Sequence, residues 1–220
     1  MSQHDFGKMA QPHLATGNGS GPENAAASAN RDQKLLADIR SCTICAAELP
    51  LGPRPVVQFS SQARILIIGQ APGTRVHNTG IPWNDPSGDR LRQWTGLSTD
   101  EFYDAHKVAS MPMGFCYPGQ RKGGDLPPRP ECAPLWHSKI LARLRARDLT
   151  LLVGLHAQAA YLPNPQTSLT LNVREFQRYG PNILPLPHPS WRSVGWSRRN
   201  PWFEAEVLPE LRRRVRSCLD

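Results

Sequence analysis

Short apolar runs alternate along the chain with longer segments whose apolar residues recur at helical spacing. The clearest run is Ile65–Ile68, four consecutive aliphatic residues followed directly by Gly69. A strand that is apolar on both faces is typical of the centre of a parallel sheet. Three further short runs occupy Lys107–Met111, Leu149–Val153 and Asn182–Leu186. The sequence therefore predicts a parallel sheet of about four strands.

The segments between these runs carry helix signals. The segment Asn200–Cys218 has Pro201 in its first turn and one apolar residue per turn on a single face, namely Phe203, Val207, Leu211 and Val215. Ser98 followed by Glu101 is a capping box that starts another helix. We expect further helices at Arg31–Arg40, Asp89–Thr95, Pro130–Arg147 and Leu155–Leu162. Strands alternating with helices predict an α/β fold, an α/β/α sandwich around a central parallel sheet.

Two stretches lack any regular pattern. Residues 1–30 are rich in Gly, Ser, Ala, Asn and Gln, and they hold too few apolar side chains to offset the entropy lost on ordering. We expect a disordered tail there and one domain over residues 31–220. Residues 111–134 are rich in proline and glycine and read as irregular structure. A chain of 220 residues can bury a core without disulfides.

The charge balance indicates the kind of partner. The chain has 26 Lys and Arg against 18 Asp and Glu, a net charge of +8. A basic soluble protein most simply binds a polyanion such as DNA, although many basic proteins do not. No apolar run approaches the length of a membrane helix, and the polar N-terminus does not resemble a signal peptide. We expect a monomer in the cytosol, with no membrane partner.

Four of the five cysteines form a pattern typical of a soft metal centre. Cys42 and Cys45 are separated by two residues, and Cys116 and Cys132 flank the proline-rich stretch. Thiolates favour zinc or iron-sulfur clusters, and spacing alone does not separate the two. The alternative is a turn with two unrelated thiols. Cys218 has no partner in the pattern and reads as a packed thiol.

The candidate active site is the loop Gly69–Gly88, which leaves the carboxyl end of the first strand. Open α/β sheets bind their ligands at that edge. Trp83 offers a flat ring that can stack on a base, or it packs in the core. Gln70 and backbone amides can polarise a leaving group. Asp85 can activate water, with His77 and Asp89 as substitutes, or it simply forms a turn before a proline.

Three features in this order resemble the uracil-DNA glycosylase superfamily, in particular its iron-sulfur branches, the fourth and fifth. The loop Gly69–Gly73 is similar to their GEAPG and GLAPA loops, the cysteine pattern is similar to theirs, and His188-Pro189-Ser190 looks like the second active-site motif. The resemblance covers about Leu35 to Leu211. The segments Thr79-Gly80 and Asp85–Gly88 look like those of the fifth branch.

The resemblance implies a DNA repair enzyme that flips uracil, or another deaminated base, out of DNA and hydrolyses its N-glycosidic bond. It favours a 4Fe-4S cluster over zinc on the four cysteines. His188 would donate a hydrogen bond to the departing base and Asp85 would orient water. The base would be held by Gln70, Ala71, His77, Trp83 and Ser190.

Two departures from the family pattern bear on activity. Ala71 stands where the original branch has a water-activating Asp, and Pro112 stands where several branches have a base-reading Asn. Main-chain groups near Met111–Gly114 would then read the base. The alternative function is an iron-sulfur DNA-binding protein that has lost catalysis. A dinucleotide-dependent oxidoreductase is disfavoured because no G-x-G-x-x-G follows Ile68.

The segment after the second motif combines bulky and cationic side chains. We expect it to fill the gap that the flipped base leaves and to contact phosphates, with a solvated basic loop as the alternative. The residues expected to contact DNA are Arg121, Lys122, Trp191, Arg192, Arg198 and Arg199.

Overall fold

The four predicted strands form one parallel sheet in the computed structural model, which describes residues 22–121 and 124–220. The sheet order is β2-β1-β5-β6. The strands are β1 (Ile65–Ile68), β2 (Val108–Ser110), β5 (Leu149–Val153) and β6 (Ile183–Leu186). Ile67 of β1 stands opposite Ser110 on one side and Leu151 on the other. The central position predicted for the first strand is confirmed.

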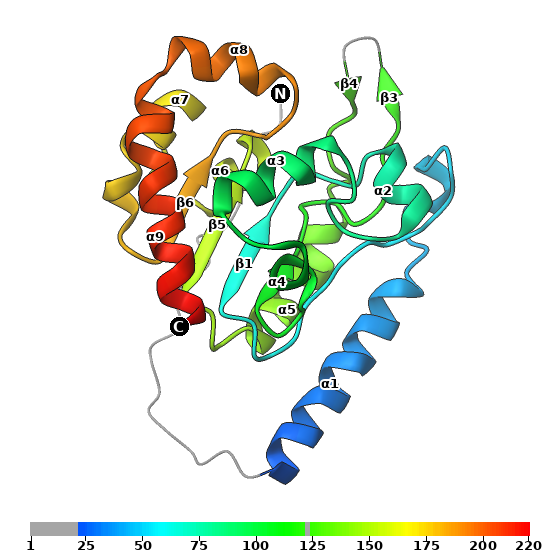
Figure 1. Cartoon of the computed structure of the whole chain (residues 1–220). Coiled ribbons are helices and arrows are strands. Elements are labelled where there is room, and N and C mark those ends of the chain that lie inside the picture. The colour runs from blue at the N-terminus through cyan, green and yellow to red at the C-terminus, as the bar shows by residue number, and fades with distance from the viewer. Residues whose placement is uncertain (1–21, 122–123) are drawn as a thin grey trace.

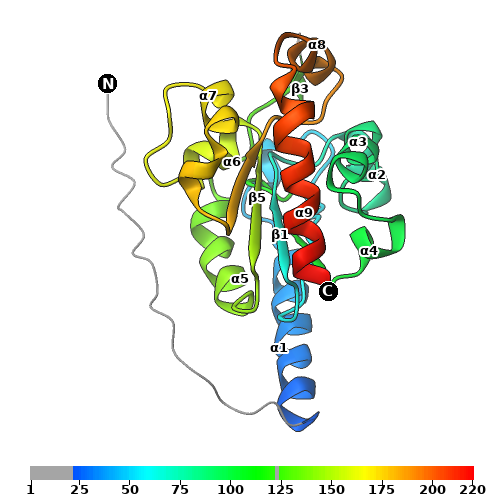
Figure 2. The same ribbon diagram turned by 60° about the vertical axis from the view of Figure 1, so that its left-hand side comes forward.

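Alternate residues of β1 face two separate cores, so the chain folds as three layers. Ile65 and Ile67 pack with helices α3 (Pro86–Thr95), α4 (Thr99–Tyr103) and α9 (Leu208–Leu219). Leu66 and Ile68 pack with α1 (Pro22–Arg40), α5 (Ser138–Arg143) and α6 (Leu155–Tyr161). Figure 2 shows the two helix layers on either side of the sheet. The predicted α/β/α sandwich is confirmed.

Two of the helices predicted from local sequence patterns form as expected. The capping box of α4 forms with both of its hydrogen bonds, between Ser98 and Glu101. The C-terminal helix buries the four predicted residues, Phe203, Val207, Leu211 and Val215. Its first turns, Phe203–Val207, are a π-helix that leads into α9. The predicted helix at Pro130–Arg147 is shorter than expected and consists of a π-turn, Ala133–His137, followed by α5.

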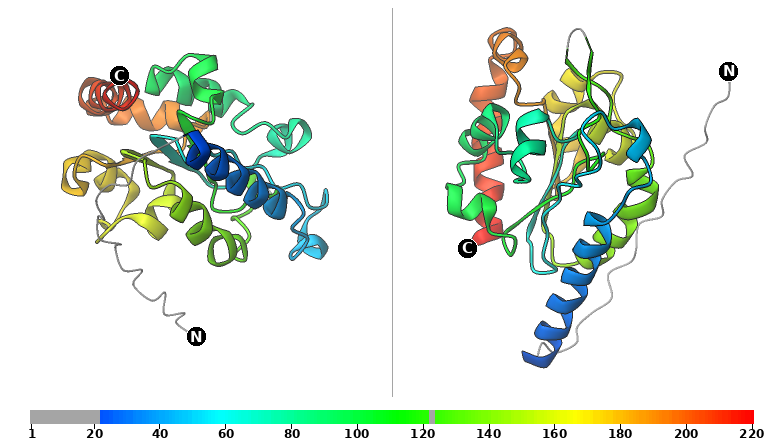
Figure 3. Two further views of the ribbon diagram at one scale, coloured as in Figure 1. Left: turned by 90° about the horizontal axis from the view of Figure 1, so that it is seen from below. Right: turned by 90° about the vertical axis from the view of Figure 1, so that its right-hand side faces the viewer.

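The predicted disordered tail is wrong for residues 22–30, which form the first half of α1. The segment is rich in alanine, a strong helix former. It is also held by α5, because Arg143 donates hydrogen bonds to the Ser28 carbonyl and to the Asp32 carboxylate. Residues 1–21 lie outside the described part of the chain. Figures 1 and 3 show α1 extending beyond the rest of the domain.

Three other stretches are more regular than predicted. The loop after β1 contains α2 (Thr74–Thr79), and the proline-rich stretch contains a short antiparallel hairpin of β3 (Gln120–Arg121) and β4 (Gly124–Asp125). The basic segment after the second motif is a helix, α8 (Arg192–Arg199). Helix α7 (Leu169–Arg174) and the 3-10 turns Ala46–Glu48 and Phe176–Tyr179 were not predicted. No described helix has the length and apolar character needed to cross a membrane.

The sheet order itself indicates where a ligand binds. The chain leaves β1 toward β2 on one side, whereas it leaves β5 toward β6 on the other. Neighbouring strands whose connections diverge open a crevice at their carboxyl ends, where open α/β sheets bind ligands. Figure 1 shows α8 and the β3–β4 hairpin at this same end of the molecule.

Candidate functional site

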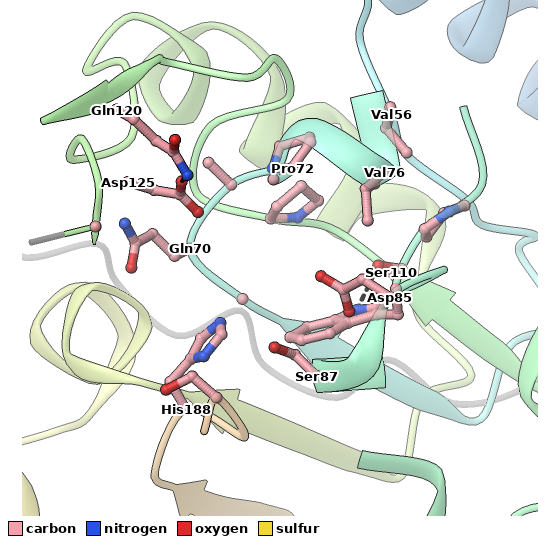
Figure 4. Close-up of a pocket in the computed structure, with 18 of the residues that line it drawn as sticks. Val56, Gln70, Pro72, Val76, Asp85, Ser87, Ser110, Gln120, Asp125 and His188 are labelled. Carbon is pink, nitrogen blue, oxygen red and sulfur yellow. Dashed lines mark hydrogen bonds between the residues drawn. The ribbon is translucent and has the colours of Figure 1, made fainter. Parts of the chain in front are cut away.

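A cavity of about 270 Å³ opens at the carboxyl edge of the sheet. It lies between the segments that follow β1, β2 and β6, and Figure 4 shows Gln120 and Asp125 of the β3–β4 hairpin at one side of it. The start of α8 also lines it, through Trp191 and Arg192. The cavity brings together eight residues that the sequence singled out, namely Gln70, Ala71, Trp83, Asp85, His188, Ser190, Trp191 and Arg192. Residues more than 100 positions apart therefore form one site.

The first loop is fixed by backbone hydrogen bonds to the segment after β2. The Met113 amide donates to the Gly69 carbonyl at 2.9 Å, and the Gly114 amide donates to the Gln70 carbonyl at 3.0 Å. The Gln70 side-chain amide donates to the Leu126 carbonyl at 3.1 Å. That bond fixes the orientation of the side chain, and its Oε1 is left to accept a hydrogen bond from a ligand.

Trp83 forms a rigid wall of the cavity. Its indole Nε1 donates to the Ser110 hydroxyl at 3.2 Å, and its ring lies 6.0 Å from the His188 ring, centroid to centroid. A Cβ atom at Gly69 would lie only 2.7 Å from the indole Cζ2. Trp83 is partly buried and packs on the core as well. The expectation of a core tryptophan is therefore true in part, because the same ring packs on the core and lines the cavity, while stacking on a base stays a prediction.

The turn that presents Trp83 depends on Gly88. Trp83 has φ of 57°, a left-handed conformation that is uncommon for a bulky residue and costs on the order of 1 kcal/mol or more. A Cβ atom at Gly88 would lie 1.7 Å from the Trp83 carbonyl oxygen. Only glycine fits there, and the strained turn is held by the first turn of α3.

Asp85 caps the helix that follows this turn. Its Oδ1 accepts a hydrogen bond from the Gly88 amide at 2.8 Å. The carboxyl group also lines the cavity, as Figure 4 shows, and it lies beside Ser87 and Ser110. The turn-forming alternative is therefore true of one oxygen, while the second oxygen is available to a ligand or to water.

His188 lines the cavity and lies between two prolines that follow β6. Burial lowers the pKa of its imidazole, and the negative charges of Asp85 and Asp125 partly oppose that shift. The imidazole is therefore neutral near pH 7. Among the described residues no hydrogen-bond partner of the ring is found, so the ring is free to bond a ligand. Gly154 packs against His188, and its φ of 87° is a backbone conformation that favours glycine.

His77 does not line this cavity. It is 7% exposed on α2, and its ring lies 6.1 Å from that of Tyr117. Burial and the charge of Arg54 lower its pKa, and its Nδ1 has no hydrogen-bond partner within the described chain. The prediction that His77 contacts the base has no geometric support. Asp89, the other substitute for Asp85, is exposed and pairs with Arg92.

Sequence reasoning missed four polar residues of the cavity, which are Ser87, Ser110, Gln120 and Asp125. Ser110 ends β2 beside the first loop, so its place at a strand end was a usable signal. Gln120 and Asp125 gave none, because only the hairpin carries them over the cavity, where the Gln120 amide donates to the Asp125 carboxylate at 3.0 Å. Figure 4 shows both on the opposite side of the cavity from Asp85.

The rim of the cavity is basic and partly apolar. Trp191 is 73% exposed, and the Arg192 guanidinium lies 4.8 Å from the centre of its ring. Arg198 and Arg199 are exposed in the last turn of α8, and Arg121 is exposed on β3. Lys122 lies outside the described residues.

The four patterned cysteines, which come from segments far apart in sequence, influence one another electrostatically. Burial raises the pKa of Cys116 to about 12 and that of Cys132 to about 11. Both pKa values are also raised by Cys42 and Cys45, so the four groups lie within electrostatic reach of one another. The Phe115 amide donates to the Cys132 sulfur at 3.5 Å. In residues 22–121 and 124–220 no three His, Cys, Asp or Glu side chains are arranged to hold a metal ion.

The fold and the cavity place the protein among the α/β proteins that have a polar ligand site at the carboxyl edge of a parallel sheet, between two strands whose connections diverge. Residues 56–212 match the family model of the uracil DNA glycosylase superfamily, which is more than two thirds of the chain. The chain belongs to this superfamily, as the three sequence features predicted. Enzymes of the superfamily generally hydrolyse N-glycosidic bonds in DNA.

Proposed function

We propose that this protein is a monofunctional DNA glycosylase that removes uracil, and other deaminated bases, and leaves an abasic site. The observation that carries the proposal is the convergence of Gln70, Trp83, Asp85 and His188 on one cavity at the sheet edge. A flat wall, a hydrogen-bond donor and a carboxylate are the groups that cleavage of a nucleoside bond needs. The protein would act as a monomer on chromosomal DNA in the cytosol.

Cleavage of the N-glycosidic bond puts positive charge on the sugar and negative charge on the departing base. A neutral His188 can donate a hydrogen bond to a carbonyl oxygen of that base, and one such preorganised donor lowers the barrier by about 3 to 4 kcal/mol. The free oxygen of Asp85 can orient the attacking water and balance the charge on the sugar. Trp83 would stack on the base.

The base must leave the DNA helix to reach this cavity, at a cost of a few kcal/mol. The exposed Trp191 at the cavity mouth is suited to fill the gap in the base stack. Arg192, Arg198 and Arg199 on α8 would contact phosphates, together with Arg121 of the opposite hairpin. The sequence adds Lys122, which lies outside the described residues.

Side chains, rather than the main chain near Pro112, would read the base. The amides of Met111, Met113 and Gly114 all donate to other backbone carbonyls, and Pro112 has no amide hydrogen. On the side of the cavity opposite Asp85, the Gln70 Oε1 and the Asp125 carboxylate are side-chain acceptors that could bond a base. Acceptors of this kind bind a ring N–H, which uracil shares with the deaminated purines, so we expect a broad range of bases.

We propose a 4Fe-4S cluster on Cys42, Cys45, Cys116 and Cys132. The four thiols influence one another's pKa, so they lie close enough together to share one centre. The resemblance of their spacing to that of the iron-sulfur branches is what favours the cluster over zinc. The Phe115 amide, which donates to the Cys132 sulfur, also stabilises a thiolate, and the Arg54 backbone lowers the pKa of Cys116. The cluster would anchor the segments that lead to the cavity, without a redox step.

Single-turnover assays on oligonucleotides that contain uracil, hypoxanthine or xanthine test the activity. We expect abasic product from the wild-type protein and at least a hundredfold slower excision by His188→Ala, which corresponds to the loss of one donor. Retention of the DNA without cleavage would instead identify a binding protein, the second candidate that Ala71 and Pro112 suggest. Strict preference for uracil would refute the broad range.

Anaerobically purified protein tests the metal centre. A cluster gives broad visible absorption with equal amounts of iron and sulfide, whereas zinc gives a colourless protein. Cys116→Ser should abolish the absorption. Cys218→Ser is the matched control because Cys218 packs on the other core, and it should retain the absorption. A colourless wild-type protein that contains zinc would refute the cluster.

A further inference from the structure

Arg90 joins the two active-site segments without lining the cavity. It lies on α3, the helix that Asp85 caps. Its Nη1 donates hydrogen bonds to the carbonyls of Pro189 and Ser190, at 3.0 and 2.6 Å. These carbonyls directly follow His188, about 100 residues further along the chain. One guanidinium therefore links the element that carries Asp85 to the one that carries His188.

The Ser190 carbonyl is shared by three donors. Besides Arg90 it accepts hydrogen bonds from the amide and the hydroxyl of Ser193, at 2.9 and 2.7 Å. Ser193 is buried in the first turn of α8. The contact thus fixes the backbone where the second motif turns into the helix that carries the basic rim.

Within the described part of the chain, the Arg90 guanidinium is hydrogen-bonded only to these two carbonyls. None of the ion pairs found among the described residues includes Arg90, whereas Arg92 on the same helix pairs with Asp89. A hydrogen bond from a charged donor is roughly twice as strong as one between neutral groups. Because the guanidinium group is planar and rigid, it can bond two successive carbonyls in few geometries, and it therefore fixes their position.

We propose that Arg90 is a positioning residue that holds the His188 imidazole in register with Asp85 across the cavity. This role rests on the proposed glycosylase function. No other described side chain bonds the Pro189 carbonyl, and the His188 ring itself has no hydrogen bond within the described chain to keep it in place. Without the hydrogen bonds from Arg90, the segment His188–Ser190 is free to shift. A misplacement of about 1 Å can slow catalysis about a hundredfold.

The test compares Arg90→Met with Arg90→Lys and with the control Arg92→Met. Arg92 lies on the same helix, contacts Tyr103 and Asp89, and does not reach the second motif. Single-turnover excision of uracil at saturating enzyme should fall ten- to a hundredfold in Arg90→Met. It should recover in part in Arg90→Lys, which keeps a charged donor, and stay within threefold of wild type in Arg92→Met.

Binding is measured separately with an oligonucleotide that contains 2′-fluoro-deoxyuridine, which resists cleavage. The Kd of Arg90→Met should remain within threefold of the wild-type value. Weaker binding at an unchanged rate would overturn the proposal and make Arg90 a phosphate contact. An unchanged rate and Kd, or equal losses in Arg90→Met and Arg92→Met, would also overturn it.

A readout that needs no activity separates this inference from the proposed function. The NMR signals of the His188 imidazole should move in Arg90→Met and remain in place in Arg92→Met. If the wild-type protein cleaves no base, the proposed function fails, but these signals still show whether Arg90 positions the motif. Signals that are identical in wild type and Arg90→Met would refute the positioning role itself.

Discussion

Asp85 has two separable duties, and two substitutions divide them. One oxygen caps α3 by accepting a hydrogen bond from the Gly88 amide at 2.8 Å, and the carboxyl group also faces the cavity. Asn at this position keeps a capping oxygen but removes the charge. Ala removes both. Asn and Asp are similarly good caps, whereas loss of the cap costs about 1 kcal/mol.

The expected magnitudes follow from this division. Asp85→Asn should retain nearly the wild-type free energy of unfolding and lose at least tenfold in excision rate, equivalent to about 1.4 kcal/mol of barrier. Asp85→Ala should lose at least the same activity and be about 1 kcal/mol less stable than Asp85→Asn. Urea unfolding gives the stabilities, and single-turnover excision of uracil gives the rates.

The control is Asp89→Asn, which removes an exposed carboxylate from the same helical turn. It should excise uracil at close to the wild-type rate. Normal excision by Asp85→Asn would remove the Asp85 charge from the mechanism. Normal excision by Asp85→Asn with slow excision by Asp85→Ala would leave Asp85 only its structural duty as a helix cap.

Three further predictions concern neighbouring groups. Gly69→Ala places a Cβ atom 2.7 Å from the Trp83 ring, so urea unfolding should show a loss of about 1 to 3 kcal/mol, with slower excision. Burial lowers the pKa of His137 to about 4. As the pH drops from about 6.5 to about 4, the unfolded chain therefore binds a proton that the folded chain does not, and the free energy of unfolding should fall by on the order of 3 kcal/mol. His137→Phe should lessen that fall, and a wild-type stability independent of pH in this window would contradict it. Asp125→Asn removes a charge that raises the pKa of His188, so the acid limb of the pH–rate profile should move to lower pH. An unmoved limb would exclude Asp125 from that coupling.

Many of the strands and helices can be predicted from the sequence because they depend on residues that are close together in the chain. The apolar run Ile65–Ile68 is buried on both faces, and the sequence alone assigned it to the centre of the sheet. The capping box at Ser98 is a contact between residues three positions apart, so it too can be read from the chain. The prediction of a disordered tail was wrong at residues 22–30. The alanines there favour a helix, and hydrogen bonds from Arg143, far away in sequence, hold it in place.

The candidate site divides in the same way. Which segments meet at the cavity could be predicted from the chain alone, since Gly69–Gly73 and His188–Ser190 each follow a strand, and strand ends meet at one edge of a parallel sheet. The packing of distant segments leaves His77 outside the cavity, beside Tyr117, and places Asp125 among the residues that line it. Only the tertiary structure revealed the hydrogen bonds from Arg90 to the carbonyls after His188. Such contacts join residues far apart in sequence, and no local propensity or periodicity specifies them.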